Sequence, residues 1–143
     1  MKKMNNKGFS LIELIIVIAI MAILVAIIAP NLTKYLGKSK KKTDSKNADE
    51  IAQQLQTAIT DYETDNGELC ADSSDVKLKW SASGAADDSG STAAPADFLT
   101  IVNDNITNST KSKENGSFAT ATISKASGKY TITVTVGNES TTR

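Results

Sequence analysis

The residue in the most unusual chemical setting is Glu13, a carboxylate inside a strongly apolar stretch. Of the 21 residues from 9 to 29, 19 are hydrophobic, and Glu13 is the only charged one. A charged side chain at the centre of a membrane helix costs about 2.5 to 3.5 kcal/mol, and less near a helix end, so such residues usually mark a partner. Glu13 therefore lies at the headgroup level, is protonated, or neutralises a positive charge nearby.

The rest of the sequence offers little for catalysis. Its 143 residues include no His and one Cys, Cys70. This composition excludes an imidazole base, a His metal ligand, a disulfide within the sequence and a Cys-based zinc cage. A nucleophilic Cys70 would need another group as its base, and we interpret it as a small buried hydrophobe or an idle thiol. We expect no catalytic residue, no cofactor and no metal site, and hence no enzyme.

The apolar stretch is long enough to cross a membrane. As a helix, residues 9–29 would measure about 31 Å, close to the ~30 Å hydrocarbon thickness of a bilayer. The stretch follows MKKMNNKG, which contains three lysines. A cleaved secretory signal also has a basic start and an apolar run, but a cut after Ala29 would place Ile27 where a small residue is needed, with Pro30 after the bond.

The string Lys7-Gly8-Phe9-Ser10-Leu11-Ile12-Glu13-Leu14 closely resembles the class III signal of type IV prepilins. This resemblance implies that a membrane prepilin peptidase cuts after Gly8 and methylates the new N-terminal residue, Phe9. It also makes Glu13 the fifth residue of the mature chain and Pro30 the family's proline after the apolar run, and it implies assembly roles for Phe9, Glu13 and Pro30. The cut would create an ammonium group on Phe9, which a carboxylate one helical turn along can neutralise in the same chain or in a neighbour.

A basic segment, residues 34–46, follows the apolar stretch, and we call it the neck. Asp44 is its only acid, and its lysines are Lys34, Lys38, Lys40, Lys41, Lys42 and Lys46. We interpret the neck as a solvated collar that touches anionic headgroups, and we do not expect DNA contact, because Tyr35 is the only aromatic residue nearby. The lysine excess after the span mildly favours a cytoplasmic C-terminus, whereas the prepilin resemblance implies the opposite, and we follow the more specific signal.

The spacing of apolar residues predicts the helices and strands of the chain. Apolar residues recur every three or four positions from residue 48 to 62, which predicts an amphipathic helix that Gly67 ends. If Pro30 kinks the helix without breaking it, the helix runs from 9 to 66. Beyond it we expect a strand over 76–80, a surface loop over 81–94, a short helix with Pro95 in its first turn, and a hairpin of 117–124 with 129–136.

The expected fold is α+β, with a long N-terminal helix packed on a small antiparallel sheet, as in type IV pilins. We expect a leader over 1–8 that is removed, a transmembrane and filament-core helix over 9–30, a basic neck and amphipathic helix over 31–66, and a globular head over 67–143. Many Gram-negative pilins pin their C-terminal region with a disulfide. The lone Cys70 cannot do this, so the sequence resembles a Gram-positive, clostridial-type major pilin.

The expected function is that of a structural subunit of a type IV pilus for adhesion, surface motility or biofilm formation. Its partners would be copies of itself in a helical homopolymer, the prepilin peptidase and N-methyltransferase, the membrane and, indirectly, the assembly ATPase and platform protein. The precursor would cross the cell membrane once with its N-terminus in the cytoplasm, and the mature filament would be extracellular. The alternatives are a pseudopilin of a type II secretion or DNA-uptake system and, more distantly, a membrane-anchored binding module or enzyme.

Overall fold

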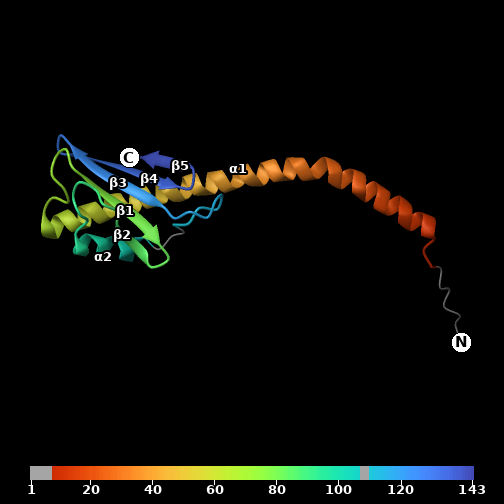
Figure 1. Ribbon diagram of the computed structural model, residues 1–143, viewed down its shortest axis with the longest axis horizontal. Coiled ribbons are helices and arrows are strands. Elements are labelled where there is room, and N and C mark those ends of the chain that lie inside the picture. Colours follow the sequence, from red (N-terminus) through yellow and green to blue (C-terminus); the bar gives the residue numbers. More distant parts are fainter. Residues whose placement is uncertain (1–7, 107–109) are drawn as a thin grey trace, which may run out of the picture. The chain divides into compact units, whose positions relative to one another are not determined.

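The computed structural model describes residues 8–106 and 110–143, so residues 1–7 of the predicted leader lie outside the described residues. The chain divides into two compact units, Met1–Lys38 and Ser39–Arg143. The elements in chain order are α1 (Leu11–Asn66), β1 (Asp75–Ser81), β2 (Gly84–Asp87), α2 (Ala96–Asn105), β3 (Thr120–Ala126), β4 (Lys129–Val136) and β5 (Glu139–Thr142) (Figure 1). The structure confirms the expected α+β class, with a long apolar helix and an antiparallel sheet.

The first unit contains the N-terminal part of α1, and all of its described residues are exposed. The helix continues through Pro30, although proline has no N–H to donate to the carbonyl one turn earlier. Two side chains next to Pro30 bond to nearby carbonyls: Thr33 Oγ1 donates to Ala29 O at 2.9 Å, and Asn31 Nδ2 donates to Ile27 O at 3.4 Å. The helix therefore runs on past the proline.

The second unit, residues 39–143, contains the predicted head and the C-terminal half of α1, which packs on the sheet (Figure 1). The expected apolar stripe of α1 lies in the core, and its fully buried members include Ile51 and Leu55. The helix ends at Asn66, and Gly67 follows with a φ of +84°, a backbone conformation that glycine adopts without a steric penalty. The structure thus confirms both the stripe and the helix end.

The sheet has five antiparallel strands in the order β2-β1-β3-β4-β5. The predicted hairpin is present as β3 and β4, although β3 begins at Thr120 and ends at Ala126 instead of covering 117–124. Ser127 and Gly128 both have positive φ, 53° and 75°, as a two-residue type I′ turn requires. Alternate residues of β4 are buried in the core, including Val134 and Val136.

Two strands were not expected. We predicted a loop over 81–94, but β2 lies within it and pairs with β1, and the chain after β4 forms β5. A tertiary contact fixes β2: Asn103 of α2 accepts a hydrogen bond from Ala85 N at 2.7 Å and donates one to Ala85 O at 3.4 Å. Small residues such as Ala85 carry almost no strand signal of their own, so the prediction of a continuous loop was wrong.

Helix α2 closes the core near the end of α1. Pro95 precedes the helix as its N-cap residue instead of lying in its first turn. Phe98 and Val102, four residues apart on one face of the helix, are fully buried. The rings of Phe98 and Tyr62 meet edge to face with centroids 5.7 Å apart, which attaches α2 to α1.

Candidate processing and assembly site

The start of α1 places Glu13 at a helix N-terminus. Ser10 immediately precedes the first helical residue, and its carbonyl accepts the N–H of Leu14 at 3.2 Å. The backbone N–H of Ser10 in turn donates to Glu13 Oε2 at 2.9 Å. This is the glutamate half of a capping box, with the carboxylate at the helix end where the helix dipole favours negative charge. Glu13 thus has a partner within its own chain.

The predicted cleavage position lies just before this cap. A Cβ added to Gly8 would meet no atom within 4 Å, and Phe9 is 90% exposed. The chain itself would therefore accept a side chain at Gly8. Any requirement for glycine there must come from a protein that handles this segment.

The surface that follows is apolar on all sides. Every residue from 8 to 43 is exposed, and the apolar side chains include Leu11 at 76% and Ile23 at 63% exposure. Among the described residues, α1 is long and apolar enough to cross a membrane. A helix that is apolar all round requires burial in lipid or against other helices. The N-terminal segment therefore combines an accessible Gly8–Phe9 bond, a capped carboxylate and an unpartnered apolar helix.

The comparisons with known proteins match the same segment. The family described as "Prokaryotic N-terminal methylation motif" matches residues 3–29. The chain is type IV pilin-like. It is 33% identical over 93 residues to "Prepilin peptidase-dependent protein A" of Clostridium perfringens (62% of this chain, 64% of the relative), and 36% identical over 63 residues to a "ComG operon protein 3 homolog" of Bacillus licheniformis (44% and 61%). The matches thus span less than two thirds of either relative, and no solved structure matches the chain significantly.

In this pilin-like chain the match to the N-terminal methylation motif covers residues 3–29 and so includes the start of α1, the helix that is long and apolar enough to span a membrane. The two features together are those of a membrane-anchored precursor. Among the predicted site residues, Glu13 accepts a hydrogen bond from the N–H of Ser10, the residue after Phe9. Pro30 lies in the helix interior, away from this cap. Lys7, the first residue of the motif, lies outside the described residues.

The neck differs from the expected solvated collar in one respect. Its lysines are exposed, but Asp44 is fully buried. Lys41 Nζ lies 3.8 Å from Glu114 Oε1 in the head, and Lys46 Nζ lies 3.5 Å from Glu50 Oε1 one turn further along α1, so two of the lysines have acidic partners. The burial of Asp44 contradicts the collar interpretation for that residue. The only sequence signal was an isolated acid in a run of lysines.

A second polar network holds the β3–β4 hairpin to the end of α1. Tyr130 Oη donates to Glu63 Oε1 at 2.6 Å and accepts the N–H of Leu69 at 3.1 Å. Lys125, 5% exposed, pairs with Glu68 at 2.8 Å. Burial and the hydrogen bond to Glu63 raise the pKa of Tyr130, and the hydrogen bond to Glu68 raises the pKa of Lys125 against the opposing effect of burial. Long-range polar contacts thus fix the hairpin where the sequence offers no disulfide.

Cys70 is buried, as the sequence suggested, and it is a free thiol. Burial raises its pKa, so the reactive thiolate is disfavoured. Across residues 8–106 and 110–143, no group of three or more His, Cys, Asp or Glu side chains could hold a metal ion.

Proposed function

We propose that this chain is a structural subunit of a type IV pilus, used in adhesion, surface motility or biofilm formation, and not an enzyme. The observation that carries the proposal is the fully exposed apolar helix within the segment, residues 3–29, that matches the N-terminal methylation motif. In the precursor the helix is solvated by lipid. In a filament, the same helix would be covered by the helices of neighbouring copies. A head-to-tail contact that does not close into a ring propagates as an open helical polymer.

Assembly of this kind requires an external energy source. Lipid tails are as apolar as these side chains, so moving the helix from lipid into a helical bundle gains no hydrophobic free energy. Helix packing and charge neutralisation remain as the specific attractions. An assembly ATPase and a platform protein would supply the work of extraction, because the sequence contains no phosphate-binding loop.

The proposal assigns a role to each segment. Residues 1–8 form the leader removed by the peptidase, 9–30 the transmembrane and filament-core helix, 31–66 the neck and amphipathic helix, and 67–143 the head. Phe9 becomes the methylated N-terminus, and its ammonium adds a second donor close to the Glu13 carboxylate that Ser10 already engages. Pro30 adapts the helix to its neighbours. The precursor spans the membrane once with a cytoplasmic N-terminus, and the mature chain is extracellular.

Two measurements test the proposal. Electron microscopy of cells with and without this chain should show surface filaments only when it is present, and purified filaments should contain a 135-residue chain, 143 minus the eight leader residues, that starts at methylated Phe9. A filament subunit that starts at Met1 would refute processing. Unchanged surface filaments, together with a loss of protein secretion or DNA uptake, would favour the pseudopilin alternative.

A further inference from the structure

Asp44 is the first buried residue along α1, and its carboxylate is completely enclosed. Three donors from a distant turn bond to it: Ser112 Oγ donates to Oδ2 at 2.6 Å, Lys113 N to Oδ1 at 2.7 Å, and Glu114 N to Oδ2 at 3.1 Å. These residues lie 68 to 70 positions away in the sequence. A carboxylate so far from water persists only when its oxygens are well paired, as they are here.

Ser112 and Asp44 together hold the turn over residues 112–116. The carbonyl of Ser112 accepts the N–H of Gly116 at 3.2 Å, which closes one helical turn, and Ser112 Oγ accepts the N–H groups of Glu114 and Asn115 at 3.1 and 3.2 Å. Ser112 caps the turn from within the segment, and Asp44 caps it from outside. The first N–H groups of a helical turn have no partner inside the turn, so they suit a carboxylate.

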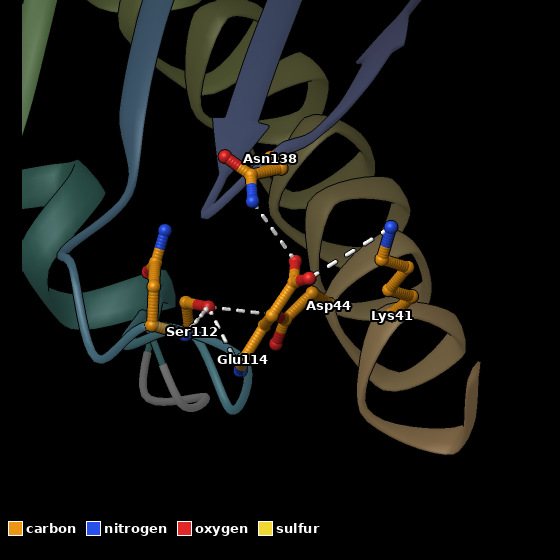
Figure 2. Close-up of polar contacts among 6 residues, drawn as sticks. Lys41, Asp44, Ser112, Glu114 and Asn138 are labelled. Atoms are coloured by element: carbon orange, nitrogen blue, oxygen red, sulfur yellow. Dashed lines mark hydrogen bonds and ion pairs between the residues drawn. The ribbon is translucent and has the colours of Figure 1, made fainter. Parts of the chain in front are cut away.

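Glu114 connects the 112–116 turn to α1 and to the turn between β4 and β5. Its carboxylate lies 3.8 Å from Lys41 Nζ and accepts a hydrogen bond from Asn138 Nδ2 at 3.2 Å (Figure 2). Asn138 lies in the turn between β4 and β5. Its neighbour Gly137 is packed so closely that an added Cβ would lie 2.5 Å from Ser112 Oγ and 3.2 Å from Asp44 Oδ2. Helix, turn and C-terminal hairpin thus meet around one carboxylate.

We propose that Asp44 is an acid-sensitive clamp, fastening the 112–116 turn and the adjoining β4–β5 turn to α1, and that protonation of its carboxylate opens the clamp. A closed clamp holds together segments far apart in sequence without a disulfide. In a filament subunit, it would hold the C-terminal part of the head on the helix that carries the apolar segment. This last consequence rests on the proposed function, whereas the clamp itself does not.

The charge environment gives the direction of the pH dependence. Burial raises the pKa of Asp44, but the hydrogen bonds from Ser112, Lys113 and Glu114 outweigh burial and leave it below its ordinary value. The charged neighbours are Lys113 and Glu114 in the turn and Lys41 on α1, while the β4–β5 turn contributes neutral Gly137 and Asn138. A depressed carboxyl pKa means that stability is present above the ordinary Asp value and is lost as pH falls through the lower folded value.

Hydrogen exchange of the full-length chain in detergent tests the clamp, with protection expressed relative to unstructured rates. At pH 7, Asp44→Asn should accelerate exchange in peptides covering 110–118 by about 10- to 150-fold, since hydrogen bonds to a charged group contribute about 1.5 to 3 kcal/mol and a tenfold change corresponds to about 1.4 kcal/mol. Asp61→Asn, which changes an exposed carboxylate on the same helix, is the matched control and should have no effect. In the wild type, protection of 110–118 should fall on acidification before that of the β3–β4 hairpin.

Equal protection of 110–118 in Asp44→Asn and Asp61→Asn would overturn the clamp. So would wild-type protection that stays constant well below the ordinary pKa of Asp. If Asp44→Asn exposes the whole head, the acid titration of the wild type decides the question: loss of protection in 110–118 at a higher pH than in the β3–β4 hairpin supports the clamp, and simultaneous loss in both segments contradicts it. None of these readouts requires filament formation, so they stand apart from the test of the proposed function.

Discussion

Glu13 should affect membrane insertion and filament assembly in opposite directions. Glu13→Val removes a charge from the apolar segment, so the precursor should insert at least as well as the wild type. The same change removes the acceptor of the 2.9 Å hydrogen bond from Ser10 N and the proposed partner of the Phe9 ammonium. The Ser10 bond lies within one chain and is the same before and after assembly, so the loss that counts is the proposed bond to the ammonium of a neighbouring copy. A hydrogen bond to a charged group contributes about 1.5 to 3 kcal/mol, so the equilibrium constant for adding a subunit should fall about 10- to 150-fold.

A second variant separates charge from capping. Glu13→Gln keeps a side-chain oxygen that can accept the Ser10 N–H, but it carries no charge. If charge neutralisation drives assembly, Gln and Val should both reduce filament yield. If capping of the helix drives it, Gln should assemble normally and Val should not.

The assay compares two pools from the same cells: filaments recovered by shearing and precursor in the membrane fraction, both quantified by immunoblot. Leu14→Val is the control, because it alters an exposed apolar residue on the same helix without touching the cap. Filament yield from Glu13→Val equal to that from Leu14→Val would show that the carboxylate has no assembly role.

Three further outcomes are expected. Gly8→Val should block removal of the leader while Phe9→Leu should not, and intact-mass measurement would show the difference. A Cβ at Gly8 would meet no atom within 4 Å, so the Val variant should fold normally, and its cleavage would contradict the assigned site. Changing Lys40 and Lys42 together to Glu should weaken filaments against shear at low salt more than at high salt, because these exposed lysines would lie beside acidic side chains of residues 47–143 of other copies, a segment with 7 Lys and Arg against 14 Asp and Glu. Equal shear resistance at both salt concentrations would exclude this contact. Gly90→Ala should lower the melting temperature of the head by several degrees, because its Cβ would lie 2.6 and 2.9 Å from backbone atoms of β1; an unchanged melting temperature would show that the 88–92 loop moves freely.

Local patterns in the sequence were sufficient for much of the fold. The run over 9–29 is apolar on every side, and such a helix cannot remain in water. The stripe through Ile51 and Leu55 has the 3.6-residue period of one buried helix face, and Gly67 supplies the left-handed residue that ends it. The segment 125–128 between two strand-like segments predicted the β3–β4 hairpin, and the structure narrows its turn to Ser127 and Gly128. Each of these signals lies within a few residues of the structure that it determines.

The functional residues also include some that the sequence identified and one, Asp44, whose setting only the folded structure revealed. The motif around Gly8 and Phe9 is a contiguous string, so the sequence alone identified it, and the structure added the bond between Ser10 and Glu13. Asp44 is the opposite case. It sits among lysines and would be solvated on any local criterion, yet it is buried because its donors arrive from a turn 68 to 70 residues away.

Tertiary structure also decided the sheet edges. The segments of β2 and β5 are short and rich in small or polar residues, so neither has the alternation that marks a half-buried strand. They become strands because β1 and β4 offer unpaired edges, and because Asn103 holds β2 in place. Periodicity encodes which face of an element is buried, whereas edge pairing and buried charge depend on partners that only the folded chain brings within hydrogen-bonding distance.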